Sequence, residues 1–173
     1  KAAIDVVMVA HVHAPDYQPE ADDPATLSSF WVTDILKNRL GFTGAIITDA
    51  MGMGGITKNY SDGYALVKAI QAGCNIIIQN YDLTSNIDIV EKAVLDGDIS
   101  IEQINSSALK MLELKQRVGL NLNPYTSLDY MMENISRKEN KETATRIASE
   151  AITLVRDKKK LLPLSSSGKD TIY

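Results

Sequence analysis

Three short runs of apolar, largely β-branched residues, at positions 6–10, 45–48 and 74–78, alternate with longer segments of helical periodicity. In those longer segments apolar residues recur at helical spacing, which gives each expected helix one apolar side. Continuous apolar strands separated by helices are typical of parallel sheets, because the crossover helices cover the faces of the sheet. The alternation therefore predicts an α/β fold with buried parallel strands and right-handed crossovers.

Capping signals define the helices that accompany these strands. Asp62 can cap one helix and Gly73 can end it, while Ser28 can cap the helix before the second strand. Ser100 and Gln103 fit a capping box, in which the serine caps the helix and the glutamine reaches back to it. The helices expected from these signals span about 28–39, 62–72, 84–95, 100–118 and 141–150.

Asp49 directly follows the second apolar run and precedes a glycine-rich stretch that contains Gly52, Gly54 and Gly55. The carboxyl ends of parallel strands are where α/β barrels keep their active sites, and stability does not require an acid at such a position. The alternative is an aspartate that hydrogen-bonds a loop or caps the next helix. Asp49 is therefore the first candidate for a catalytic residue.

Composition excludes some classes of protein. The 173 residues are 45% apolar and 23% charged, with a net charge of −4, which argues against a nucleic-acid partner because phosphate binding needs clustered basic residues. No apolar stretch approaches the roughly 20 residues of a membrane span. The single cysteine, Cys74, cannot form an internal disulfide and is expected to be a buried apolar residue.

Six segments, in order along the chain, resemble glycoside hydrolase family 3, most closely its bacterial β-N-acetylglucosaminidases. They include a strand that ends in Ala10-His11, a Pro-Ala-Thr-Leu-Ser helix entry at 24–28, and the strand that leads to Asp49. A following Ala-Gly-x-Asp strand is matched except that Asn75 stands where aspartate is usual. The six segments span 7–12, 23–28, 40–53, 69–78, 97–115 and 148–164.

The resemblance implies that residues 1–120 form an incomplete, C-terminal portion of a (β/α)8 TIM barrel, with about three strand–helix units. Residues 121–140 are expected to be a linker, because they are polar and charged, and 141–173 the start of a second α/β domain. Closing a barrel takes about eight strands, so the N-terminal half of the barrel is expected to be missing. Bare strand edges predict that isolated chains pair with one another as homo-oligomers.

By the same resemblance, Asp49 is the nucleophile of a retaining exo-β-glycosidase that releases terminal β-linked N-acetylglucosamine from peptidoglycan or chitin-type fragments. Its substrate would be a carbohydrate, contacted by His11, Met51 and Met53, and no metal or organic cofactor is implied. A β-glucosidase or β-xylosidase of the same family is the alternative. The compartment is open between the bacterial cytoplasm and the cell wall or exterior.

The general acid/base of this branch is a histidine in a Lys-His-Phe-Pro-Gly-His type of stretch, which this sequence does not contain. Retaining hydrolysis needs that second group to protonate the leaving oxygen and to activate water. The chain is therefore expected to be inactive by itself.

His11-Val12-His13 also allows a different class, a metal-dependent barrel hydrolase. Alternate residues of a strand lie on one side, so both imidazoles could bind one ion. Such a site needs further ligands from other strands, and Asp49 is the only evident carboxylate at a strand end.

Overall fold

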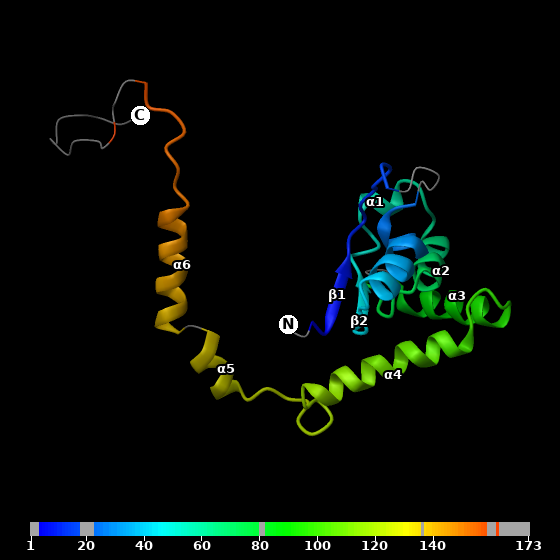
Figure 1. Ribbon diagram of the computed structural model, residues 1–173. Coiled ribbons are helices and arrows are strands. Elements are labelled where there is room, and N and C mark those ends of the chain that lie inside the picture. Colours follow the sequence, from blue (N-terminus) through cyan, green and yellow to red (C-terminus); the bar gives the residue numbers. More distant parts are fainter. Residues whose placement is uncertain (1–3, 18–22, 80–81, 136, 159–161, 163–173) are drawn as a thin grey trace. The chain divides into compact units, whose positions relative to one another are not determined.

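The computed structural model describes residues 4–17, 23–79, 82–135, 137–158 and 162 (Figure 1). It forms two compact units, Lys1–Pro124 and Tyr125–Tyr173, and each is treated by itself. The elements of the first unit are β1 (Val6–Val9), η1 (Ala25–Leu27), η2 (Phe30–Arg39), β2 (Ala45–Thr48), α1 (Gly54–Thr57), α2 (Asp62–Ala72), α3 (Leu83–Leu95) and α4 (Ile101–Arg117).

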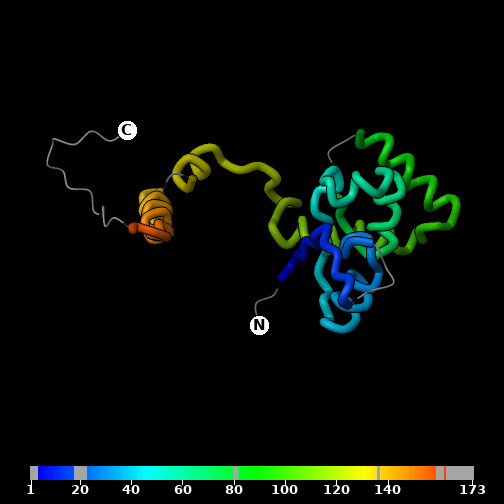
Figure 2. The backbone as a smooth tube through the Cα atoms, turned by 90° about the horizontal axis from the view of Figure 1, so that it is seen from above, coloured from blue at the N-terminus to red at the C-terminus, as the bar shows by residue number. Residues whose placement is uncertain are grey.

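The first two predicted strands pair in parallel, as expected. Val6 aligns with Ala45 and Val9 with Thr48, so both strands end at the same edge. Figures 1 and 2 show the two strands at one border of the first unit, with the helices between residues 25 and 95 gathered on the other side of them. A parallel pair needs a long connection, and here it is supplied by η1 and η2.

The third predicted strand, 74–78, is joined to β2 by backbone bonds around Ile76 and by side-chain bonds on either side of them. It makes only one isolated parallel bridge, between Ile47 and Ile76. The side-chain oxygen of Asn75 accepts the backbone N–H of Ile46 at 2.9 Å. The hydroxyl oxygen of Thr48 accepts the backbone N–H of Ile78 at 3.0 Å. These side-chain bonds replace ladder bonds, which explains why the segment lies beside β2 without forming a regular strand.

Burial differs between the two strands. β2 is buried, with Ile46 0% exposed and Thr48 0% exposed. The prediction that 6–10 is a buried strand is wrong for this structure, because Val6 is 39% exposed and Met8 53% exposed. Apolar side chains on a parallel strand are normally covered on both faces. The exposed face of β1 therefore marks a surface that a larger sheet would bury.

The segment before β2 contains the helix predicted over 28–39, with a different hydrogen-bond pattern. Its helix, η2, is a π-helix that begins at Phe30, and its preceding residue Ser29 makes no side-chain capping bond. Ser28 ends η1 and is 4% exposed. Ser28 stands at the start of this helix, as predicted: its backbone is extended and its carbonyl oxygen accepts the N–H of Val32 at 3.1 Å. Thr26 and its neighbours form a short 3-10 turn just before it.

The next helices follow the predicted capping pattern in part. α2 ends at Gly73, which has the left-handed φ of 113° that glycine tolerates best. Its capping position is Ser61 and not Asp62, which lies in the first turn. Ser100 caps α4 through a bond from the N–H of Gln103, 3.1 Å. Only half of the capping box forms, because the Gln103 side chain donates to the carbonyl of Ile70 instead.

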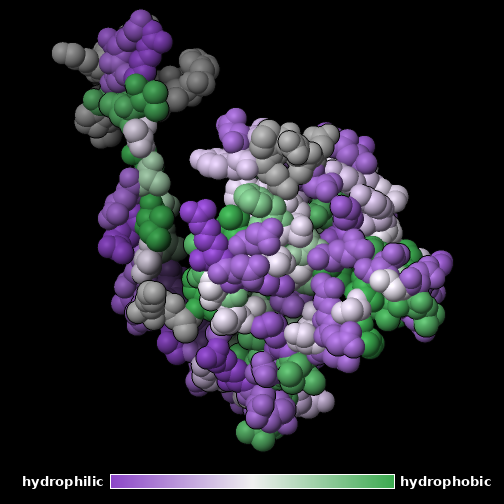
Figure 3. Space-filling view, turned by 45° about the vertical axis from the view of Figure 1, so that its right-hand side comes forward, coloured by the Kyte–Doolittle hydropathy of each residue, from purple (hydrophilic) through white to green (hydrophobic). Residues whose placement is uncertain are grey.

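Three apolar clusters make the core of the first unit. One contains Leu27, Met51 and Ile56 and lies under the loop after β2. A second, with Val32, Ile46 and Cys74, lies between η2 and the sheet, and a third joins α2 to α3. Other apolar side chains lie at the surface, among hydrophilic ones (Figure 3). Within the described ranges, no helix has the length and apolar character needed to cross a bilayer.

The second unit contains α5 (Leu128–Ile135) and α6 (Lys138–Glu150). The segment expected to be a linker, 121–140, therefore includes a helix of its own, and the predicted helix at 141 begins three residues earlier. Neither helix has a buried residue. Of the segment expected to start a second α/β domain, 141–173, positions 159–161 and 163–173 lie outside the described residues.

Candidate active site

Asp49 is the first residue after β2, at the carboxyl edge that β1 and β2 share. Its backbone N–H donates to the carbonyl oxygen of Val9, 3.0 Å away, so the aspartate is attached to both strands. Its side-chain atom Oδ1 accepts the N–H of Ala50 at 2.8 Å. The carboxylate is half-buried, and within the described residues Oδ2 has no hydrogen-bond donor. One oxygen is thus fixed while the other is available.

The loop that follows Asp49 is attached on several sides. The carbonyl oxygen of Ala50 accepts the N–H of Met53 at 3.0 Å, which closes a tight turn. The N–H of Met51 donates to the carbonyl of Ile78 at 2.9 Å, which joins the loop to the third strand segment. Together with the bond from Asp49 to Val9, the bond from Met51 to Ile78 connects the loop to structure on both sides of β2. The position of the carboxylate is therefore set by the strands and not by a free loop.

His11 lies two residues beyond β1 and faces this loop. Its Nε2 is 3.0 Å from the carbonyl oxygen of Ala50, and its Nδ1 is 2.8 Å from the hydroxyl of Thr26. A carbonyl only accepts hydrogen bonds, so Nε2 carries a hydrogen. Both ring nitrogens of His11 therefore already have protein contacts, and only its partly exposed ring surface is available to a ligand.

The two candidate methionines have different environments. Met51 is 2% exposed and packs in the cluster with Leu27 and Ile56. Met53 is 48% exposed and immediately precedes α1. Both lie on the loop that carries Asp49, but only Met53 presents its side chain to solvent. The structure therefore favours Met53 over Met51 as a residue that a bound sugar could touch.

The geometry gives no support to a metal site at His11 and His13. His13 is exposed, whereas His11 would have to break an existing bond to offer a nitrogen lone pair. In the part of the chain that the structure describes, no group of three or more histidine, cysteine or acidic side chains could hold an ion.

Two residues near the site join separate segments through their side chains, which their sequence pattern does not indicate. Thr26 is 0% exposed, and its hydroxyl reaches both His11 and the carbonyl of Val9, 3.2 Å away. Asn75 bonds β2 through its oxygen and donates from Nδ2 to the hydroxyl of Ser107 at 3.0 Å. Thr26 belongs to the Pro-Ala-Thr-Leu-Ser segment, and that motif was the one available signal for it.

Cys74 and Lys37 are neighbours beneath the sheet and take no part in this edge. Burial raises the pKa of the Cys74 thiol from 9.0 to about 12, so it is protonated at neutral pH and is not a nucleophile. Burial also lowers the pKa of Lys37, whose ammonium donates to the carbonyl of Gly73 at 2.7 Å. The prediction that Cys74 is a buried apolar residue is confirmed, since it is 2% exposed.

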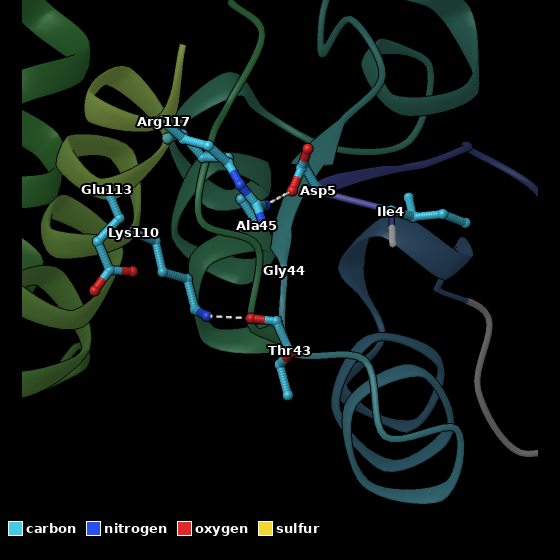
Figure 4. Close-up of a pocket in the computed structure, with 9 residues that line it drawn as sticks. Ile4, Asp5, Thr43, Gly44, Ala45, Lys110, Glu113 and Arg117 are labelled. Atoms are coloured by element: carbon cyan, nitrogen blue, oxygen red, sulfur yellow. Dashed lines mark hydrogen bonds and ion pairs between the residues drawn. The ribbon is translucent and has the colours of Figure 1, made fainter. Parts of the chain in front are cut away.

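A cavity of about 400 Å³ lies at the opposite edge of the strands (Figure 4). Its walls include Asp5, Thr43 and Lys110, and an ion pair joins Asp5 to Arg117. This is the amino end of β1 and β2, where barrels keep residues that serve stability. We therefore place the candidate site at Asp49 and not in this cavity.

A carboxylate at the shared carboxyl edge of parallel strands is the arrangement that α/β enzymes, TIM barrels among them, use for an active site. The comparison with known families is specific: the profile described as "Glycosyl hydrolase family 3 N terminal domain" matches residues 1–114. The chain belongs to glycoside hydrolase family 3. The predicted resemblance to this family is confirmed.

Individual similar proteins support this family assignment. A protein named beta-N-acetylglucosaminidase/beta-glucosidase from Cellulomonas fimi is 26% identical over 172 residues, 95% of this chain and 30% of that protein. The solved family 3 beta-N-acetylglucosaminidase from Paenibacillus sp. str. FPU-7 is 33% identical, with a TM-score of 0.76 over 91% of this chain and 30% of that one. The solved beta-glucoside phosphorylase BglX bound to 2FGlc is 30% identical, with a TM-score of 0.81 over 93% of this chain and 31% of that one. The chain thus spans about a third of the length of these proteins.

Proposed function

We propose that this chain supplies the C-terminal part of the catalytic barrel of a retaining exo-β-glycosidase, with Asp49 as its nucleophile. The position of Asp49 carries the proposal: it is the carboxylate at the carboxyl edge of β2, with Oδ1 bound to Ala50 and Oδ2 unoccupied within the described residues. In the first step Oδ2 attacks the anomeric carbon, and the bond to the leaving oxygen breaks through an oxocarbenium-like transition state.

Because Oδ1 accepts a backbone hydrogen bond, the carboxylate cannot rotate freely about its terminal torsion. A fixed nucleophile approaches the anomeric carbon in one orientation, and orientation accounts for a large part of enzymatic rate enhancement. The leaving oxygen must be protonated by a second group, which we propose lies in barrel segments other than these 173 residues. The glycosyl-enzyme then transfers its sugar to water.

We propose terminal β-linked N-acetylglucosamine as the sugar. Two of the similar proteins bear that activity in their names, and the exposed Met53 on the loop that carries Asp49 offers an apolar surface to a sugar ring or its acetamido methyl group. His11 bonds this loop at Ala50 and Met51 packs from the loop into the core, so both would support it from the protein side. A β-glucosidase specificity is the alternative, since the Cellulomonas fimi protein carries both names.

A second candidate reaction is phosphorolysis, favoured by the similarity to a beta-glucoside phosphorylase with a TM-score of 0.81. Both reactions pass through the same glycosyl-enzyme on Asp49 and differ in whether water or phosphate accepts the sugar. Product analysis separates them: with phosphate added, phosphorolysis gives a sugar 1-phosphate and hydrolysis gives the free sugar.

The test is hydrolysis of chromogenic β-N-acetylglucosaminide, β-glucoside and β-xyloside by the full-length enzyme and its Asp49→Asn variant. We expect activity on the first substrate and a loss of about 10³-fold or more in the variant. Asp88→Asn is the matched control, because Asp88 is an exposed carboxylate on α3. Equal activity in Asp49→Asn and the parent would refute the nucleophile, whereas activity only on another glycoside would change the sugar alone.

A further inference from the structure

We propose that His11 and Thr26 are a positioning pair that fixes the nucleophile loop, and that His11 acts on catalysis through the protein backbone. This inference rests on the proposed role of Asp49. It concerns three segments that are distant in sequence: the residues after β1, the η1 turn and the loop after β2.

The polar atoms of Ala50 connect the pair to the nucleophile. Its N–H donates to Oδ1 of Asp49 at 2.8 Å, and its carbonyl oxygen accepts from Nε2 of His11 at 3.0 Å. A shift of the His11 ring would therefore move the one residue that fixes the carboxylate. Because the same carbonyl also accepts from Met53, the ring acts on the turn that carries the whole loop.

Thr26 fixes the orientation of the His11 ring. Its hydroxyl is 2.8 Å from Nδ1 of His11 and 3.2 Å from the carbonyl oxygen of Val9. Val9 in turn accepts the backbone N–H of Asp49 at 3.0 Å. The threonine is 0% exposed, so water does not compete for these bonds. The chain of contacts starts and ends at the nucleophile, and none of its members is fully exposed.

Backbone packing closes the other side of His11. A Cβ atom placed on Gly55 would lie 3.1 Å from Cβ of His11, so α1 approaches the histidine as closely as a glycine allows. The neighbouring Gly54 has a different environment, since its nearest atom would be the end of the flexible Lys58 side chain at 3.4 Å. His11 is thus enclosed by Thr26, Ala50 and Gly55, as expected for a residue that orients a loop.

The test compares kcat and KM of full-length enzymes with single substitutions, each measured well below its unfolding midpoint. Thr26→Val keeps the shape and removes the hydroxyl, and His11→Gln keeps a donor with altered geometry. We expect kcat to fall about ten- to a hundredfold in both, with KM within about twofold, because misplacement of the nucleophile weakens the transition state. Thr26→Ser restores the hydroxyl and should recover most of the loss.

Thr33→Val is the matched control, because it removes a comparable hydroxyl bond, to the carbonyl of Ala72 at 2.8 Å, away from this loop. It should lower the melting temperature and leave kcat close to that of the parent. A parental kcat in Thr26→Val, or a raised KM with parental kcat in His11→Gln, would overturn the positioning role. Asp49→Asn is assayed in parallel. Full activity of that variant would refute the proposed function, whereas loss of activity in that variant alone would refute only the positioning role of His11 and Thr26.

Discussion

The side-chain oxygen of Asn75 lies 2.9 Å from the backbone nitrogen of Ile46 and accepts the hydrogen bond that a strand neighbour would otherwise take. Ile46 is 0% exposed, so its N–H has no access to water if this oxygen is removed. Asn75 thereby replaces part of a β-ladder with one side chain.

Asn75→Ala should therefore destabilise the protein by about 1–3 kcal/mol, the range for a buried donor that loses its acceptor. Asn75→Asp keeps an oxygen for Ile46, and the Ser107 hydroxyl can turn to donate to the second oxygen, so we expect a smaller loss. Scanning calorimetry of the full-length protein measures both. An aspartate variant that is less stable than the alanine variant would contradict this role of Asn75.

Gly73 and Gly97 both end helices with a left-handed φ, of 113° and 84°, but only one is crowded. Alanine at Gly97 meets nothing within 4 Å, so Gly97→Ala should cost only the backbone strain of about 1–2 kcal/mol. Alanine at Gly73 would place Cβ 2.5 Å from Nζ of Lys37 and 2.7 Å from Oγ1 of Thr33. Gly73→Ala should therefore be clearly the less stable variant by chemical denaturation, and equal losses would contradict the packing described here.

Ionisation of Cys74 should make stability fall in alkaline solution. The pKa of its thiol is raised by burial from 9.0 to about 12, so the unfolded chain loses this proton at a lower pH than the folded one. Its contribution is therefore complete below about pH 9 and is lost as the pH rises toward about 12. The measurement is the stability difference between the parent and Cys74→Ala across this range. The difference should shrink as pH rises, whereas a constant difference would show that the thiol does not titrate on unfolding.

The isolated 173-residue chain should self-associate and show no turnover. Val6 and Met8 of β1 are 39% and 53% exposed, and apolar strand surfaces of this kind recruit partners. Small-angle scattering measures the mass of the species in solution, and a chromogenic glycoside measures activity on the same sample. A monodisperse monomer would contradict the first part of this prediction, and measurable hydrolysis would contradict the second.

The sequence predicted the part of the site that depends on local pattern. The apolar run 45–48 followed by Asp49 sufficed to place an acid at the carboxyl edge of a parallel strand, because strand direction and strand end are both readable along the chain. The ends of α2 and α4 followed from Gly73 and Ser100 for the same reason: capping is a short-range interaction.

The remaining features depend on long-range contacts. Thr26 bonds His11 across 15 positions and His11 bonds Ala50 across 39, so no local periodicity could indicate that these residues are connected. Met51 and Met53 are both methionines on one irregular loop, where no periodicity indicates which side chain is buried. The turn closed by Ala50 decides it. The exposure of β1 depends on which strands cover it, which the run 6–10 alone does not specify.

The most direct test of the central claim is to trap the covalent intermediate. The full-length enzyme is incubated with a fluorinated β-glycoside that has an activated leaving group, digested with protease and mapped by mass spectrometry. The account predicts one added sugar on the peptide that contains Asp49, and no addition in Asp49→Asn while Asp88→Asn is labelled like the parent. A sugar attached to any other residue, or rapid turnover with inversion and no adduct, would contradict the assignment of Asp49 as the nucleophile.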